Sequence, residues 1–229
     1  SEMCIRDRNN IVFEYEKQKV TYQVHYYLGD IFQSAWTESD TVVNGMEITS
    51  VIDKCPNGYH EDKIVPELPT KITSNNKLIE VYYVENEKVT INYEAKTGGS
   101  VSRPYETLLP VTETAQGSLA TASAGYHFVD WTDKDGNTVS TTLKFVPQKV
   151  NGVNVPATYT ANFVENDDIT INYVALTGGS VSLGSETIAP VNGTAQGSTA
   201  IAANGYTFEK WTNEKGCLLY TSPSPRDRS

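Results

Sequence analysis

The chain has 229 residues, a formal net charge of −10 and a hydrophobic content of 38%. This length and composition suffice for one or two ordinary cores. The acidic balance argues against nucleic acid or an anionic membrane surface as a partner, because both select clustered lysine and arginine. No apolar run approaches the roughly 18 residues that a membrane-spanning helix needs, so we expect no membrane insertion within this chain.

Both ends of the chain differ in character from the rest. Residues 1–8 (SEMCIRDR) and 217–229 (CLLYTSPSPRDRS) resemble translated sequencing-adapter sequence of the kind found in metagenomic fragments. We expect both to be artefacts that pack poorly, a genuine basic tail being the alternative for 217–229. Residues 9–16 echo a later strand and are interpreted as the last strand of a truncated preceding module.

A first complete module is predicted over residues 17–86. Residues 20–28 (VTYQVHYYL) alternate between apolar and polar side chains with the two-residue period of a half-buried strand, and residues 78–85 (LIEVYYVE) do the same. Between them lie a turn region at 55–62 (CPNGYHED) and the stretch 65–73 (VPELPTKIT), whose prolines favour a loop or an edge.

A second module is predicted over residues 87–167. It opens with a strand at 89–95 (VTINYEA), turns at Lys96–Gly99 and continues through a hairpin turn at Asp133–Gly136. Further strands are predicted in GSLATASA, HFVDWT, LKFVP and the closing segment ATYTANF. No long amphipathic helix is evident. A short helix near Glu106–Leu109 or Glu38–Val42 is left open.

A tandem repeat defines the third module. Residues 89–136 recur at 169–216 with a constant offset of 80, and 28 of the 48 aligned positions are identical by count. This period exceeds the roughly 20–50 residues of solenoid repeats. We therefore predict a mainly β chain of small β-sheet modules arranged as beads on a string. The third module, 168–216, has no counterpart of the closing strand and is expected to be the least stable.

Comparison of the two copies separates packing positions from surface positions. Aromatic and glycine positions recur, as with Tyr93 and Tyr173 or Gly98 and Gly178. Within one strand of the second module, strict alternation would put Trp131 on the face opposite Phe128. Either a β-bulge intervenes or Trp131 makes a second, separate contact.

The repeated residues also carry a resemblance. With their GGSV turn, GYxFxxW core and closing YTANF strand, residues 89–163 resemble the divergent internalin B-repeat family of Gram-positive surface proteins. Residues 20–84, with VHYYL and NNKLIEVYY, resemble the mucin-binding-protein-like repeats more loosely. Both families occur in extracellular stalks and adhesins. The resemblance thus implies β-grasp-like modules and an extracellular, cell-wall or secreted location.

Catalytic and metal-binding patterns are weak in this sequence. The segment 133–137 (DKDGN) alternates oxygen ligands around a glycine, as calcium loops do, but it lacks the bidentate glutamate of an EF-hand, so a plain hairpin turn is favoured. His25, His60 and His127 lack metal-ligand spacing. Cys55 has no neighbouring base to activate it as a nucleophile. We therefore predict no enzyme activity, no catalytic or metal site and no cofactor.

Adjacent tyrosine pairs give the one candidate binding site. Residues 26–27 and 82–83 are both Tyr-Tyr, so one ring of each pair must point away from the core. Tyr27 and Tyr82 are the candidates for contacting a host glycan, a mucin or an extracellular protein. Cross-strand packing of the two rings on a sheet face is the alternative.

The sequence thus leaves three functional hypotheses. The first is a non-enzymatic fragment of a bacterial surface or secreted adhesin, with repeats serving as a stalk and as weak multivalent binders. The second is a dedicated glycan- or mucin-binding module. The third is an accessory region of a large secreted enzyme.

Overall fold

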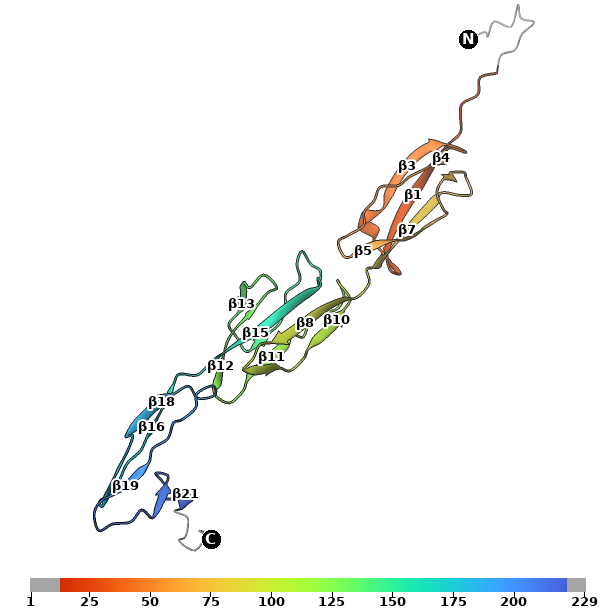
Figure 1. Cartoon of the computed structure of the whole chain (residues 1–229). Helices are drawn as coiled ribbons and strands as arrows, with labels where there is room; N and C mark the ends of the chain where they lie inside the picture. Colours follow the sequence, from red (N-terminus) through yellow and green to blue (C-terminus); the bar gives the residue numbers. More distant parts are fainter. Residues whose placement is uncertain (1–12, 222–229) are drawn as a thin grey trace, which may run out of the picture. The chain divides into compact units, whose positions relative to one another are not determined.

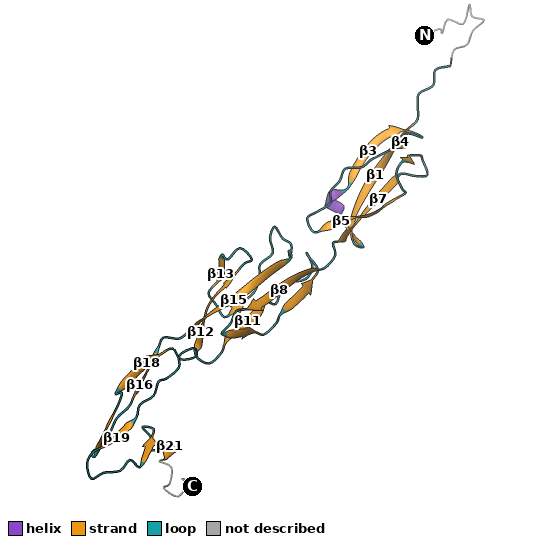
Figure 2. Ribbon diagram, viewed as in Figure 1, coloured by secondary structure: helices purple, strands orange, loops and turns teal. Residues whose placement is uncertain are grey.

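The computed structural model describes residues 13–221, and nearly all the regular secondary structure in this part of the chain is β-strand (Figure 1). Its one helical element is a 3-10 turn, η1 (Ser34–Trp36), drawn in purple in Figure 2. The chain divides into two compact units. The first contains the residues up to 92 together with 105–117 and 146–157, and the second contains the remaining residues, so the division falls within the second module. The prediction of tandem, mainly β modules is confirmed.

The first module has seven strands, five of which form a mixed sheet. Its strands are β1 (Lys19–Leu28), β2 (Ile31–Phe32), β3 (Glu38–Val43), β4 (Glu47–Ile48), β5 (Tyr59–Val65), β6 (Thr70–Lys71) and β7 (Leu78–Glu85). The sheet has the order β2-β1-β7-β5, with β3 also on β1. The first and last strands run parallel, as expected at the centre of a β-grasp-like sheet, while β4 and β6 form a separate pair.

The core of this module follows from the alternation in β1 and β7. One face of the two strands is buried, and Ile72 joins it in a single cluster: Val20, Tyr22, Val24, Tyr26, Ile79, Val81 and Tyr83. The buried tyrosine hydroxyls have partners. Tyr26 donates to the Ile52 carbonyl at 2.8 Å, and Tyr83 donates to Asp53 at 3.0 Å. Both hydroxyls therefore lie inside the core without the cost of an unsatisfied polar group.

The second module closes around a tryptophan. Its strands are β8 (Val89–Ala95), β9 (Gly99–Val101), β10 (Tyr105–Leu108), β11 (Ser118–Ala122), β12 (Tyr126–Thr132), β13 (Thr138–Ser140), β14 (Lys144–Phe145) and β15 (Ala157–Glu165). They form one sheet of order β10-β8-β15-β12-β13 and a second of order β14-β11-β9. Trp131 is fully buried and packs against Tyr93, Phe128 and Phe145. From β15, Phe163 and Tyr159 complete this cluster.

A β-bulge explains how Trp131 reaches the core. The pairing of β12 with β15 shifts register between Phe128 and Asp130, which turns the side chains that follow to the other face. Trp131 therefore lies on the same side as Phe128, with ring centroids 6.4 Å apart. Of the two alternatives that alternation left open, the bulge is the correct one.

The third module repeats the local structure, and its described residues, up to 221, include no counterpart of the closing strand. Its strands are β16 (Ile169–Asn172), β17 (Gly179–Val181), β18 (Ser185–Ile188), β19 (Ala200–Ala202), β20 (Lys210–Thr212) and β21 (Leu218–Thr221). They form three separate two-stranded sheets, β16-β18, β17-β19 and β20-β21. In the second module β15 lies between β8 and β12, so its absence leaves their counterparts β16 and β20 unconnected. No residue from 168 to 219 is buried.

Three predictions about local structure need correction. The short helix left open near Glu106–Leu109 or Glu38–Val42 is wrong, because both segments lie in strands, β10 and β3, that pair antiparallel with the first strand of their module. The region at 55–62, interpreted as a turn, is a turn at 57–58 but continues into β5 from residue 59. Residues 13–16, the described part of the preceding strand predicted over 9–16, form no strand, because no neighbouring strand pairs with them.

The predicted artefact segments are partly described. β21 pairs with β20 in the register that β13 keeps with β12, with Trp211 opposite Tyr220 as Trp131 is opposite Ser140. Leu218 and Leu219 nevertheless remain 58% and 68% exposed, so the strand covers an open edge and does not complete a core. Residues 1–12 and 222–229 lie outside the described residues, and the predictions for them are not tested.

Candidate functional site

The two candidate tyrosines meet on the face of the first sheet opposite its core. Tyr27 of β1 and Tyr82 of β7 are directly opposite each other in the parallel pairing, and their rings stack with centroids 4.6 Å apart and an interplanar angle of 12°. Their neighbours Tyr26 and Tyr83 are in the core, at 0% and 1% exposure. The prediction that one ring of each pair points outward is therefore correct, and the cross-strand packing alternative describes how the two rings meet.

Polar and aromatic groups surround this pair. The Tyr27 hydroxyl donates to Glu80 at 2.8 Å, and the Lys63 ammonium lies 4.9 Å from the centroid of the Tyr82 ring. Phe32 lies beside Tyr27 with ring centroids 5.5 Å apart, and His25 lies 4.6 Å from Phe32. We call this set the aromatic face: His25, Tyr27, Phe32, Lys63, Glu80 and Tyr82.

The electrostatics of the aromatic face keep its tyrosines neutral. The hydrogen bond to Glu80, followed by burial, raises the pKa of Tyr27 to about 12. Burial and the Glu80 carboxylate also raise the pKa of Tyr82. Neutral, half-buried rings beside a carboxylate and an ammonium can stack on the apolar face of a sugar and hydrogen-bond its hydroxyls. The same geometry is also what simple sheet packing produces.

Sequence reasoning found the two tyrosines but not their surroundings. His25 and Glu80 were accessible to it, because they lie two residues from Tyr27 and Tyr82 on the same face of alternating strands. Phe32 and Lys63 were not, because they come from β2 and β5, whose pairing only the folded sheet defines.

The other chemical candidates have structural roles. Asp133 accepts hydrogen bonds from the backbone N–H groups of Asp135 and Asn137, each at 2.9 Å, and so closes its own hairpin turn. Asn213 makes the corresponding bonds in the third module. Among the described residues no group of three or more His, Cys, Asp or Glu side chains could hold a metal ion. Burial, with Asp53 and Glu61, raises the pKa of Cys55 and thus disfavours a nucleophilic thiolate.

One acidic residue of the second module is buried. Glu106 is only 5% exposed, and its carboxylate accepts hydrogen bonds from the backbone N–H groups of Gln116 and Gly117 at 2.9 and 3.0 Å. Its repeat equivalent, Glu186, accepts from Gln196 and Gly197. These glutamates pin the loop before β11 and its counterpart before β19. They are structural supports of the repeat.

The fold and these supports define a tandem array of small β modules. The chain belongs to the family described as Divergent InlB B-repeat domain, which matches residues 89–167 and 169–226, more than half of its length. Repeats of this kind are typical of cell-surface proteins. The second match runs to residue 226, beyond residue 216 where the third repeat was predicted to end. The resemblance of residues 17–86 to mucin-binding-protein-like repeats stays a prediction.

A search of curated proteins found no match for this chain. The described residues contain no apolar helix of the length that a bilayer crossing needs.

Proposed function

We propose that this chain is a non-enzymatic repeat region of a bacterial surface or secreted adhesin, in which the modules act as a stalk and bind weakly and multivalently. The observation that carries the proposal is the repeated B-repeat module itself, at residues 89–167 and 169–226. Repetition adds length and valency, whereas a catalytic site is needed only once. The buried Glu106 supports the non-enzymatic part of the proposal, because its carboxylate accepts hydrogen bonds from the module's own backbone.

The aromatic face favours a second candidate function for the first module. Host glycans, mucin or an extracellular protein are the proposed partners, with Tyr27 and Tyr82 as the contact residues. Stacked, half-buried rings flanked by Lys63 and Glu80 match the mixed apolar and polar surface of a sugar. A single such face gives modest affinity, which an array strengthens through effective concentration.

Binding of the intact chain to immobilised mucin and to a glycan panel tests both candidates. The chain would be measured as a monomer and as a dense array on beads, alongside Tyr27→Ala and Tyr82→Ala. Tyr105→Ala is the matched control, because Tyr105 is a 60% exposed tyrosine of the second module, outside the aromatic face. If the modules act as a stalk, we expect the monomer to bind weakly and the array to bind with higher apparent affinity.

Two outcomes would change this conclusion. Tight binding by the monomer that is lost in Tyr27→Ala but kept in Tyr105→Ala would make the first module a dedicated glycan-binding domain. Hydrolysis of any glycan or peptide by the purified chain would overturn the non-enzymatic proposal.

A further inference from the structure

The closing strand of each complete module ends in a glutamate that reaches the module after it. Glu85 is the last residue of β7, and its carboxylate accepts hydrogen bonds from the loop after β10. The Val111 and Thr112 backbone N–H groups donate to one carboxylate oxygen, and the Thr112 hydroxyl donates to the other at 2.7 Å. All these residues belong to the same compact unit, although the glutamate and the loop come from different modules.

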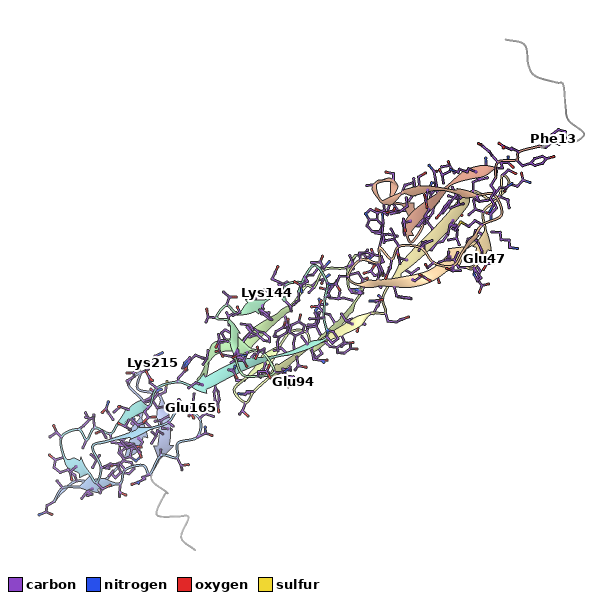
Figure 3. All side chains as sticks on the ribbon, turned by 90° about the horizontal axis from the view of Figure 1, so that it is seen from above. Phe13, Glu47, Glu94, Lys144, Glu165 and Lys215 are labelled. Carbon is purple, nitrogen blue, oxygen red and sulfur yellow. The ribbon has the colours of Figure 1, made fainter. Side chains whose placement is uncertain are left out.

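The same arrangement recurs eighty residues later. Glu165, labelled in Figure 3, is the last residue of β15. Its carboxylate accepts from the backbone N–H groups of Val191 and Asn192 at 2.6 and 3.0 Å, and from the Asn192 side-chain amide at 2.5 Å. Glutamate, loop valine and the following side-chain donor thus occupy equivalent positions in both joints. The recurrence is notable because the first module is not a copy of the second.

A glycine in the earlier module makes room for the valine of this loop. A Cβ atom on Gly58 would lie 2.5 Å from Val111 Cγ2, with Val153 also closer than 3.0 Å. A Cβ atom on Gly125 would collide in the same way with Val191. Contacts this short do not occur between real side chains, so the loop can approach only because both positions are glycine.

A second hydrogen-bonded pair holds each glutamate strand to this glycine. The residue after the glutamate is asparagine in both joints. Asn86 and Asn166 each donate their backbone N–H to the carbonyl of the glycine, at 2.9 and 2.8 Å. Their side chains also pair with a histidine, His60 at 2.8 Å and His127 at 2.9 Å. His60 and His127 therefore occupy equivalent places in the two joints.

We propose that the Glu-Asn end of the closing strand, together with the Gly-Tyr-His start of its neighbour, is a docking surface for the Pro-Val loop of the following module. The partner is another module whose loop offers two consecutive backbone N–H groups after a proline, as at 110–112 and 190–192. One charged carboxylate oxygen accepts both N–H groups, and the other oxygen accepts the side-chain donor that follows the valine. Successive modules are thereby held together by hydrogen bonds at a repeated joint, in addition to the short charged linker that connects them.

The hydrogen bonds leave an electrostatic signature on both glutamates. Burial pushes the pKa of Glu85 upward, but the Thr112 and Val111 hydrogen bonds and Lys149 outweigh it, so the pKa is lowered. The Asn192 and Val191 hydrogen bonds lower the pKa of Glu165. Both joints therefore favour the ionised carboxylate. This inference does not depend on whether the aromatic face binds a ligand.

The third module supplies a matched control for the glycine. Gly205 is the repeat equivalent of Gly125, with φ of +84° against +82°, and nothing lies within 4 Å of a Cβ added there. Alanine at Gly205 therefore carries the backbone strain of a left-handed residue without a collision. For the glutamate, the control is Glu87→Ala, which removes an exposed carboxylate two residues from Glu85.

The test is amide hydrogen exchange and ¹⁵N relaxation on the intact, ¹⁵N-labelled chain. Glu85→Ala should speed exchange at the Val111 and Thr112 amides by about tenfold or more, while the Val81 amide in the first core stays within about twofold. Gly58→Ala should do the same, and the first and second modules should then tumble more independently. Glu87→Ala and Gly205→Ala should leave exchange at 111–112 unchanged.

Two results would overturn the proposal. One is unchanged exchange at Val111 and Thr112 in Glu85→Ala, which would show that the hydrogen bonds do not hold the loop. The other is independent tumbling of residues 19–85 and 89–165 in the wild-type chain. Because Glu85→Ala removes only a half-buried side chain at a strand end, it separates the joint from any folding failure of Gly58→Ala.

Discussion

Replacement of the core tryptophan by alanine should cost far more in the second module than in the third. Trp131 and Trp211 are equivalent positions of the repeat, eighty residues apart. Trp131 is fully buried among side chains that include Phe145 of β14, whereas Trp211 remains half-buried in a module whose described residues include no counterpart of β14 or β15. The pair therefore measures the combined effect of these two strands on one side chain.

The magnitudes follow from what each ring touches. Trp131→Ala removes a fully buried ring, which costs about 3–5 kcal/mol. It also leaves the Leu143 carbonyl without the indole N–H that donates to it at 3.2 Å, adding about 1 kcal/mol. Trp211 packs against Tyr173 and Phe208. Because its ring is only half-buried, Trp211→Ala should lower the free energy of unfolding by about 1–2 kcal/mol.

A urea titration followed by ¹H–¹⁵N amide signals measures this, because each module is read from its own cross-peaks. A small domain has about 5–15 kcal/mol of stability, so Trp131→Ala should lower the urea midpoint of the second module steeply. Trp211→Ala should shift the third module much less. Equal losses of free energy of unfolding in the two variants would refute the argument that β14 and β15 together bury the tryptophan.

Three further outcomes are expected. Burial raises the pKa values of Tyr26 and Tyr83 from 10.0 to about 12. Their contribution to stability is therefore complete below pH 10 and is lost as pH rises through 12. An alkaline titration followed by tyrosinate absorbance should show the first module unfolding in that range. Asp133→Ala should speed amide exchange in its hairpin turn, since the carboxylate accepts two of the turn's N–H groups. The pKa values of Glu85 and Glu165 are lowered from 4.5, so the joints should be intact above pH 4.5 and loosen as pH falls through the lowered pKa, as amide exchange in the two loops would report.

Alternation made the long central strands predictable. The segments 20–28 and 78–85 agree with β1 and β7 within one residue, because one face of each is buried and the other is not. β5 lacks this signal. Its burial pattern is exposed through His60, Glu61, Asp62 and Lys63, because it is an edge strand that pairs only with β7. A polar edge strand has the sequence pattern of a turn, so it cannot be recognised when its neighbouring strand is unknown.

Tertiary partners decide the features that local pattern could not. In the sequence, Glu106 cannot be told from an exposed acidic residue. In the structure, the loop at 116–117 covers it and donates two backbone N–H groups to its carboxylate. The bulge that brings Trp131 to the core depends on the register of β12 against β15. The partners of Glu85 and Glu165 could not be predicted from the sequence, because they are 26 and 27 residues away in the next module.

Hydrogen exchange across the whole unmodified chain tests the central structural claim most directly, namely that each module is stabilised by its own closing strand. We expect the backbone amides of β1, β7, β8, β12 and β15 to be strongly protected. Amides in β16 and β20, the equivalents of β8 and β12, should exchange at least about tenfold faster than those of β8 and β12, because β16 and β20 lack a shared neighbour. Equal protection of β8 with β16 and of β12 with β20 would contradict this claim.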